Sequence, residues 1–156
     1  MLPITPFLWF PPGQAEEAAR FYCRIFPDSR VERVVSLPGE SPAGPVEVVD
    51  FVLRGQPFIG MQCAGGDAFN HAVSFTVYCE TQDEIDRFWN ALLEGGGHPE
   101  ACGWLRDRWG VAWQITPRVM PEMMAHPDRR RAKQAVDAMV AMVKFDLAAL
   151  QAAFDA

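Results

Sequence analysis

The chain has 156 residues, 49% of them hydrophobic, which is enough to bury a sizeable core in one domain. Its formal net charge of −6 argues against nucleic acid or an anionic membrane surface as a partner, because both recruit clustered lysine and arginine. No segment approaches the roughly 20 apolar residues that span a bilayer, and the N-terminal residues lack a signal-peptide pattern, so we expect a cytoplasmic location.

The first part of the chain predicts a strand, a helix and three more strands. The apolar residues 4–10 form a strand that ends at Pro11 and Pro12, since prolines do not continue a ladder. A helix follows and stops before Pro27, and its apolar residues recur at helical spacing: Ala18, Tyr22, Ile25 and Phe26. Strands are then expected over residues 31–37, 46–53 and 58–63.

The second part predicts a similar succession. Residues 73–79 form a strand, and Thr81 with Glu84 makes a capping box that opens an amphipathic helix, ended by glycines 95–97. Short strands are expected over residues 99–105 and 111–116, joined by a tight turn at 107–110. The pattern indicates that this half repeats the architecture of the first.

Three helices are expected in the remaining residues. They cover 121–125, 128–144 and 146–154, with Asp128 and Asp146 as N-caps. The longest carries an apolar stripe formed by Val136, Met139, Val140 and Val143. Such a stripe packs on this subunit or on a second copy, and we expect a homodimer.

A repeat underlies the two halves. Glu17 returns as Glu84 and Phe21 as Phe88, a constant shift of 67 residues, and residues 59–62 match 111–114 in apolar-small-apolar-Gln order. We expect an α+β fold of two tandem βαβββ modules: module one at about 3–65, module two at about 70–117 and a helical tail at about 118–156. The modules should share one core as a single domain, 1–156, because about 55 residues would be marginal alone.

Several phrases are more specific than the element order, namely residues 5–10, 15–18, 21–22, 102–107, 110–115 and 121–123. Together with the two modules, they resemble the PhnB-like branch of the vicinal-oxygen-chelate superfamily, which includes glyoxalases, bleomycin-resistance proteins and dioxygenases. This branch is also labelled 3-demethylubiquinone-9 3-methyltransferase. Such a resemblance indicates architecture more than substrate.

The resemblance implies a cup in which strands of both modules hold a divalent metal. By strand position, the ligands would be Thr5 or its neighbours, either Gln62 or Met61, Ala72 and Gln114. None of these is His, Asp or Glu, the residues that such cations prefer, and the four cysteines lack CxxC spacing and are expected as free thiols. We therefore expect no metal and no other cofactor, with a divalent metal kept as the alternative.

His71 stands one residue before the fifth-strand ligand position. A shift of one residue would make it a metal ligand, but one ligand does not hold a metal. We favour a strand-end histidine hydrogen-bonded to backbone.

Strand alternation assigns the faces of the two modules. Leu8 and Phe10 match Phe75 and Val77 and should pack under the helices, which leaves the opposite side chains toward the cup. In the closing strands, we expect the bulky residues in the core and the glutamines toward the cup. The candidate ligand-binding residues are Thr5, Phe7, Trp9, Gln62, Ser74, Thr76 and Gln114.

Alternatives remain for these residues. Phe7 and Trp9 could be core residues, and Gln114 could satisfy strand-edge backbone groups. Asp107 and Arg108 are expected as a solvated pair or a turn cap rather than as catalytic groups.

We expect a protein that binds a small uncharged or weakly polar organic molecule without a metal, since aromatic walls and a few amides suit such a ligand. The alternative is an enzyme: a metal-dependent lyase, isomerase or dioxygenase, or the methyltransferase that the family label implies. No GxGxxG pattern supports a Rossmann-type site for S-adenosylmethionine. No catalytic residue is assigned.

Overall fold

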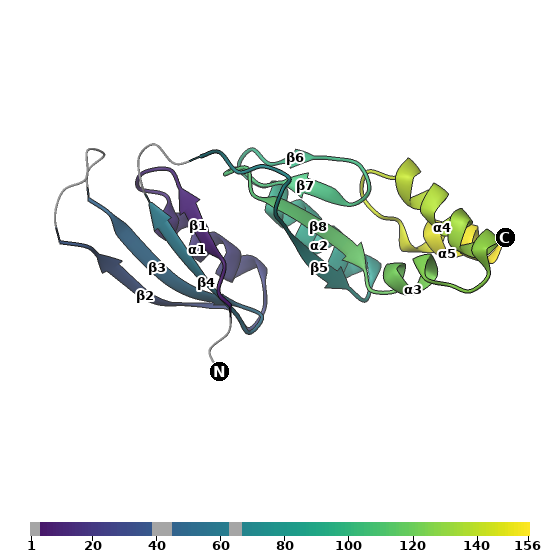
Figure 1. Ribbon diagram of the computed structural model, residues 1–156, viewed down its shortest axis with the longest axis horizontal. Helices are drawn as coiled ribbons and strands as arrows, with labels where there is room; N and C mark the ends of the chain where they lie inside the picture. Colours follow the sequence, from purple (N-terminus) through teal and green to yellow (C-terminus); the bar gives the residue numbers. More distant parts are fainter. Residues whose placement is uncertain (1–3, 39–44, 63–66) are drawn as a thin grey trace. The chain divides into compact units, whose positions relative to one another are not determined.

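The computed structural model describes residues 4–38, 45–62 and 67–156 (Figure 1). The chain divides into two compact units, residues 1–68 and 69–156. Each unit contains one βαβββ module with a mixed four-stranded sheet, and the second also contains the tail helices. The predicted α+β fold of two βαβββ modules is confirmed.

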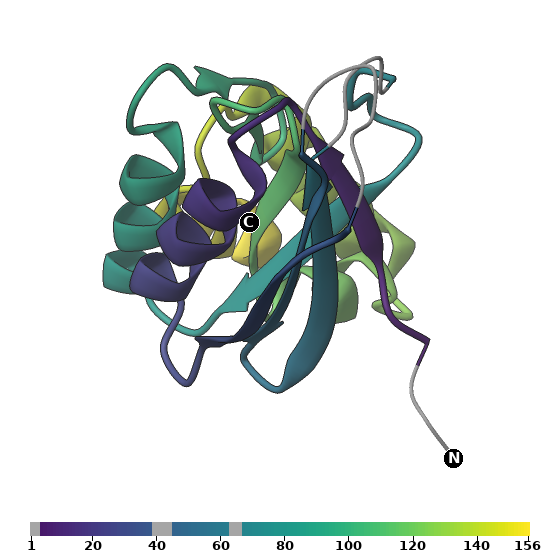
Figure 2. The ribbon, with the colours of Figure 1, turned by 90° about the vertical axis from the view of Figure 1, so that its left-hand side faces the viewer.

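Module one consists of β1 (Phe7–Phe10), α1 (Ala15–Ile25), β2 (Arg30–Ser36), β3 (Glu47–Leu53) and β4 (Gln56–Gln62). The strand order is β1-β4-β3-β2, with β1 parallel to β4 and the other pairs antiparallel. Figure 2 shows α1 against one face of this sheet. The first strand is shorter than predicted because pairing starts only after Pro6, whose carbonyl accepts a bond from the Ile59 N–H.

The core of module one lies between α1 and its sheet. Tyr22 is fully buried, and its ring centroid lies 6.5 Å from that of Phe10 and 6.4 Å from that of Phe51. These contacts join the predicted apolar side of the helix to the sheet and cover one of its two faces.

Module two consists of β5 (Ser74–Cys79), α2 (Gln82–Leu93), β6 (His98–Pro99), β7 (Trp104–Arg106) and β8 (Ala112–Pro117). Its order, β5-β8-β7-β6, repeats that of module one, with β5 parallel to β8. Thr81 caps α2 as predicted, since its Oγ1 accepts the Glu84 N–H at 3.2 Å.

The prediction of a single strand over residues 99–105 of module two was wrong. Residues 99–105 do not form one strand but divide into β6 and β7 around a turn. Cys102 and Gly103 have φ angles of 59° and 77°, a left-handed conformation that cannot continue a strand.

The tail contains α3 (Met120–Met124), α4 (Arg129–Ala141) and α5 (Leu147–Asp155), with Asp128 and Asp146 as N-caps as predicted. Helix α4 ends three residues before the predicted end at 144. The chain becomes extended there, and the carbonyls of Met142 and Val143 accept the N–H groups of Cys102 and Gly103 at 2.8 Å each.

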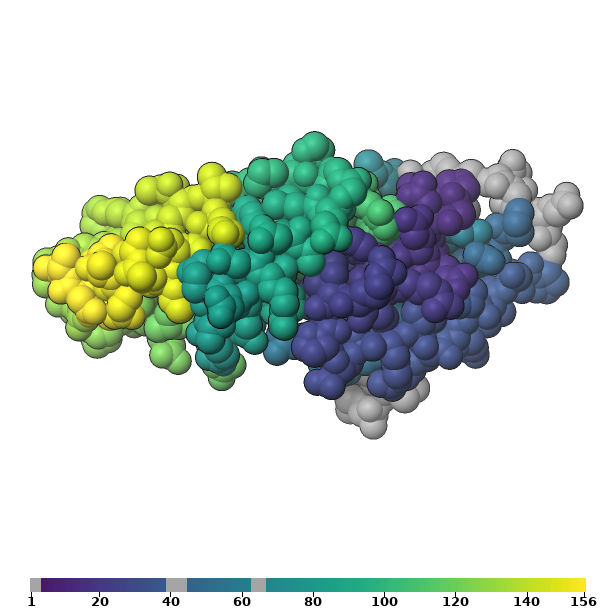
Figure 3. All heavy atoms as spheres, turned by 180° about the vertical axis from the view of Figure 1, so that it is seen from behind, coloured from purple at the N-terminus to yellow at the C-terminus, as the bar shows by residue number. Residues whose placement is uncertain are grey.

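The tail packs against module two within the same unit (Figure 3). The Gln82 side chain accepts from the Leu147 N–H at 2.8 Å and donates to the Phe145 carbonyl at 3.0 Å. A Cβ atom at Gly103 would lie 2.3 Å from the Phe145 ring, so this close approach requires glycine. These contacts make the tail part of the second unit.

The apolar stripe predicted for the longest helix is only partly covered: Val136 and Met139 are half-buried, and Val143 lies beyond the end of α4. Ala132 and Ala135 are buried, whereas Val140 and Val143 are 60% and 52% exposed. None of the helices in the described ranges combines the length and the apolar character that crossing a membrane requires.

Three of the cysteines, Cys23, Cys79 and Cys102, are free thiols as expected. Cys63 lies outside the described residues.

Candidate functional site

The sheet of module two has one face that α2 does not cover. Helix α2 packs on β5, β7 and β8, and most side chains on that side of the sheet are buried, among them Val77, Leu105, Trp113 and Ile115. The opposite side, which we call the open face, carries Ser74, Thr76, Trp104, Arg106, Ala112 and Gln114 by strand register. Ser74, Thr76 and Gln114 therefore lie on the side of the sheet opposite α2, as strand alternation predicted.

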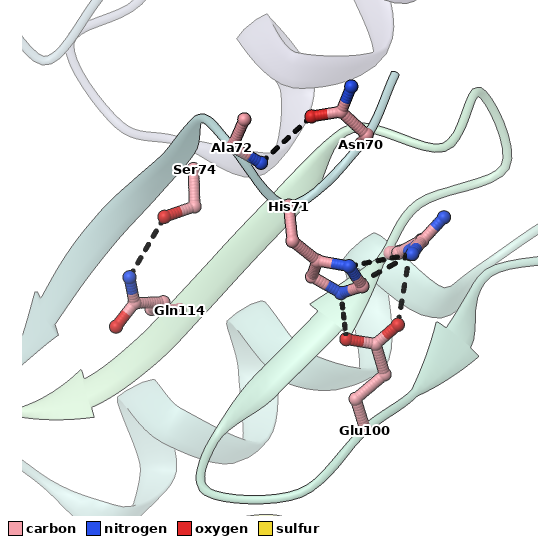
Figure 4. A network of polar contacts seen from close by, with 7 residues as sticks. Asn70, His71, Ala72, Ser74, Glu100 and Gln114 are labelled. Carbon is pink, nitrogen blue, oxygen red and sulfur yellow. Dashed lines mark hydrogen bonds and ion pairs between the residues drawn. The ribbon is translucent and has the colours of Figure 1, made fainter. Parts of the chain in front are cut away.

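Two of the predicted site residues are in contact on this open face. The Gln114 Nε2 donates to the Ser74 Oγ at 2.9 Å (Figure 4). Thr76 lies directly opposite Gln114 in the neighbouring strand and is exposed. Gln114 thus bonds to a side chain, so the alternative that it satisfies strand-edge backbone groups was wrong. Among the described residues, its Oε1 has no partner and is free to accept a bond.

A second polar cluster joins His71 and Glu100, both labelled in Figure 4, with Arg106. The His71 Nε2 lies 2.6 Å from the Glu100 Oε2, and the Arg106 Nη2 lies 2.8 Å from the His71 Nδ1. The Arg106 Nε closes the ring by donating to the Glu100 Oε1 at 3.1 Å. Because arginine only donates, Nδ1 must accept, and the His71 proton is assigned to Nε2, which donates to the carboxylate.

Three elements bring this cluster together. His71 lies in the turn before β5, where the Asn70 Oδ1 accepts the Ala72 N–H at 2.8 Å. Arg106 belongs to β7, and Glu100 follows β6, held by its N–H bond to the Trp104 carbonyl at 2.8 Å. The His71 ring centroid lies 5.8 Å from that of Trp104.

Sequence reasoning missed this cluster. We expected His71 to bond to backbone, but both of its ring nitrogens face side chains, 29 and 35 residues away in the chain. No local pattern reports such contacts. The signal that could have found them is the repeat itself, because it places β7 beside β8 and thereby sets Arg106 on the same face as Gln114.

The cluster fixes a guanidinium group on the open face. The side chains of Glu100, Arg106 and His71 are 29%, 34% and 45% exposed, so the ion pair of Arg106 with Glu100 contributes little to stability, about 0–1 kcal/mol. The bonds do restrict the orientation of Arg106. Its Nη1 has no partner among the described residues and can donate to a bound molecule.

Module one presents a different open face. In the parallel pairing of β1 and β4, Phe7 lies opposite Ile59 and Trp9 opposite Met61, and paired residues share a face. Phe7 and Trp9 are 48% and 47% exposed, so the alternative that they are core residues was wrong. Thr5 lies just before β1 and is half-buried.

The predicted orientation of Gln62 was also wrong. Gln62 pairs with Phe10 and is buried on the α1 side, with its Nε2 3.4 Å from the Pro45 carbonyl and no partner for its Oε1 in the described part of the chain. The sequence match aligned Gln62 with Gln114. The strand register instead makes Met61 the counterpart of Gln114, since Trp9 matches Thr76 across the repeat. A shift of one residue reverses the face.

The residues present do not fit a divalent metal. The positions implied by the metal-binding resemblance carry neutral side chains. Gln62 lies on the α1 side of the module-one sheet. No group of three or more His, Cys, Asp or Glu residues that could hold an ion occurs within residues 4–38, 45–62 and 67–156. Glu100 and His71 would supply two ligands, but the Arg106 cation is bonded to both.

Asp107 is a buried turn cap, which is one of the two predicted roles. It is 2% exposed and accepts from the N–H groups of Trp109 and Val111 and from the Trp113 Nε1, at 2.9, 3.1 and 2.9 Å. The carboxylate is therefore held inside the fold and does not face the open side of the sheet.

A cavity of about 660 Å³ lies elsewhere in the second unit, at the ends of β5 and β8 beside α3 and α5. It contains none of the predicted site residues. Its charged lining includes Arg118 and Glu80, which form an ion pair at 3.3 Å with side chains 68% and 67% exposed. Side chains this exposed orient a ligand less well than the more buried bonded groups on the open face, so we place the candidate site on that face.

Comparisons with known proteins agree with this architecture. The family model described as 3-demethylubiquinone-9 3-methyltransferase matches residues 3–116 and ends before α3. A PhnB protein from Bacillus cereus with the same description is 32% identical, with a TM-score of 0.64 over 74% of this chain and 99% of that chain. Among curated proteins, no relative matches the chain significantly.

Two more distant structures share the fold alone. Protein PA1353 from Pseudomonas aeruginosa is 22% identical, with a TM-score of 0.60 over 72% of this chain and 95% of that chain. The fosfomycin resistance protein FosX from Mesorhizobium loti is 12% identical, with a TM-score of 0.52 over 81% of this chain and 98% of that chain.

Proposed function

The chain belongs to the 3-demethylubiquinone-9 3-methyltransferase family, the PhnB-like group within the glyoxalase/bleomycin-resistance/dioxygenase superfamily, and from this premise we propose that it binds a small, uncharged or weakly polar organic molecule on the open face of module two. The proposed binding requires no metal ion. It uses fixed polar side chains of the sheet to orient the molecule.

The observation that carries this proposal is the bond between Gln114 and Ser74. It holds the Gln114 amide in one orientation and leaves its Oε1 available as an acceptor. Thr76 lies beside this amide and supplies a hydroxyl group. Trp104 lies on the other side of Gln114 in the register and supplies an aromatic surface. An aromatic surface with a few fixed polar groups is typical of sites for small organic molecules.

Phe7 and Trp9 support a role for module one in binding. Phe7 and Trp9 are about half exposed and share one face of the sheet, and neighbouring exposed aromatic side chains often mark a surface that contacts another molecule. We propose that both make apolar contacts with a molecule on the uncovered side of the module-one sheet, and that Thr5, just before them, lies near that contact. Gln62 has no part in this proposal.

The binding proposal can be tested by two-dimensional NMR on isotope-labelled protein. We expect uncharged aromatic fragments to shift the side-chain N–H signals of Gln114 and Trp104 in the absence of added metal. The Trp113 indole, which faces α2, serves as an internal control because it lies on the other side of the same sheet. If no fragment shifted the Gln114 and Trp104 signals, or if shifts required a divalent cation, the proposal would be wrong.

The family description favours a second candidate function, methyl transfer to 3-demethylubiquinone-9, over residues 3–116. This activity would require a site for a methyl donor as well as for the acceptor. Incubation with S-adenosylmethionine and the acceptor, followed by mass spectrometry, separates the two candidates. A methylated product formed by the protein and not by a heat-denatured control would establish the enzyme.

A further inference from the structure

Arg106 is a polar side chain on the open face of module two whose orientation is fixed by several hydrogen bonds. Two of its three nitrogens have partners: Nε donates to Glu100, and Nη2 donates to His71. Glu100 and His71 are also bonded to each other, so the three side chains form a closed ring. A guanidinium held at two of its nitrogens has little freedom, and its remaining Nη1 donors point to a defined place.

The charge of this cluster is as informative as its geometry. Arg106 carries one positive charge, Glu100 carries one negative charge, and His71 accepts at Nδ1 in its neutral form. The ring is therefore neutral overall. A ligand carboxylate on Nη1 would bond to the same guanidinium as Glu100 and would be repelled by that carboxylate, whereas an uncharged oxygen would gain the hydrogen bond without the repulsion.

Trp104 adds a requirement of shape. It lies next to Arg106 on β7, on the same face as Gln114, and its ring is half-buried with the His71 ring tilted against it at 57°. An aromatic side chain held in this way offers a flat apolar surface for another ring. The free N–H donors of Arg106 therefore form a polar end of the candidate site, and the ring of Trp104 forms a flat apolar end.

We infer that the molecule bound on the open face is a flat, uncharged carbonyl compound whose oxygen accepts from Arg106 and whose ring packs on Trp104. This inference rests on the proposed function and adds the chemical class of the ligand. Glu100 and His71 are positioning residues: they orient the guanidinium, and Glu100 disfavours anionic ligands. Gln114 remains available to pair with a second polar group of the same molecule.

Benzamide and benzoate provide a matched test, because they have the same ring and nearly the same size but differ in charge. Each is titrated by NMR into the full-length protein near neutral pH, with the Trp104 and Gln114 signals as the readout. We expect benzamide to bind at least fivefold more tightly than benzoate. Arg106→Gln should weaken benzamide binding at least fivefold without changing the melting temperature by more than a few degrees.

Glu100→Gln tests the positioning role directly. It removes the negative charge but keeps an amide that can bond, so the ratio of benzoate to benzamide affinity should rise at least fivefold, which a merely structural residue would not cause. Arg106→Lys provides a second variant if Arg106→Gln does not fold, and it should also weaken benzamide binding because an ammonium cannot replace the bonded fork.

The outcomes separate this inference from the proposal on which it rests. If benzoate bound as tightly as benzamide, or if the Arg106 variants bound benzamide normally, the inference would be overturned while binding on the open face would stand. If neither probe moved the Trp104 and Gln114 signals, the inference would be overturned, and the proposed function would also be overturned if no other uncharged aromatic fragment moved them.

Discussion

Gln114 on β8 and Ser74 on β5 are joined side chain to side chain, with the Gln114 Nε2 2.9 Å from the Ser74 Oγ. The bond crosses the one parallel pair of strands in module two. It fixes the amide on the face opposite α2 and leaves its oxygen without a partner among the described residues. The same amide would rotate freely if Ser74 were absent.

Gln114→Leu is therefore expected to weaken ligand binding by about 1–3 kcal/mol, because a partner group on the ligand is left unpaired. The melting temperature without ligand should change little, since the side chain is only half-buried. Melting curves of both proteins with and without benzamide provide the measurement. A loss of stability with unchanged benzamide affinity would show that Gln114 is only structural.

Gln62→Leu is the matched control for this variant. Gln62 lies on the α1 side of its sheet, and its Oε1 is buried without a partner in the described part of the chain. Leucine removes this unpaired buried group, so the control should bind benzamide normally and should be as stable as the parent or more stable.

The contrast between these two glutamines shows where sequence analysis succeeded and where it failed. The helix starts at Thr81, Asp128 and Asp146 were predictable because caps are encoded by neighbouring residues. The side of the sheet on which Gln62 lies was not predictable. A four-residue match between two strands can be out of register by one position, and only the pairing of β4 with β1 shows the correct register.

The polar cluster was beyond local reasoning for a different reason. His71, Glu100 and Arg106 come from a turn, a strand end and a strand, and no periodicity links them. The architecture of the repeat predicts which strands are neighbours. It does not predict which side chains of a connecting turn reach over them.

Purified protein is expected to contain no stoichiometric divalent cation. Thr5, Ala72 and Gln114 provide at best weak neutral ligands, and the fourth position is either Gln62, on the wrong face, or Met61. Elemental analysis after gel filtration without chelator is the measurement. One equivalent of tightly bound manganese, iron, nickel or zinc would contradict the prediction.

We also propose that the protein is a homodimer and that the exposed side of α4 contributes to the interface. Val140 in the last turn of α4 and Val143 in the extended segment after it are both more than half exposed, and apolar side chains gain stability when a partner covers them. Val140→Glu should then shift the equilibrium toward monomer. Sedimentation velocity at micromolar concentration measures the shift.

Ala141→Glu is the control for the dimer prediction, since it adds the same charge at the next position of α4, about 100° around the helix from Val140. Ala141 is exposed. We expect this control to sediment like the parent. A monomeric parent protein, or equal effects of both variants, would exclude the stripe as an interface.

The pH dependence of stability should include a contribution from Asp86. Hydrogen bonds from Lys144 and Gln82 lower the pKa of Asp86 below its ordinary value of 3.8. Since the folded pKa is the lower one, the stabilisation is fully present at pH values above 3.8 and is lost as the pH falls through the folded pKa. The effect is small because the side chain is 40% exposed.

Urea unfolding between pH 2 and pH 6 tests this linkage. Asp86→Asn keeps a group that can bond to Gln82 but cannot titrate, so the difference in unfolding free energy between parent and variant should shrink as the pH falls. A difference that stayed constant over this range would contradict the assignment.

Asp107 provides the strongest single test of the fold of module two. Its carboxylate is 2% exposed and receives bonds from two backbone N–H groups of the turn before β8 and from the Trp113 indole, which belongs to the core. Asp107→Ala removes this acceptor from all three donors, and two of these bonds are buried, so we expect a loss of about 3 kcal/mol or more in unfolding free energy. Asp107→Asn keeps one acceptor oxygen and should cost less.

Urea unfolding at neutral pH, followed by tryptophan fluorescence, gives both values. An Asp107→Ala variant as stable as the parent would show that this turn does not depend on the carboxylate.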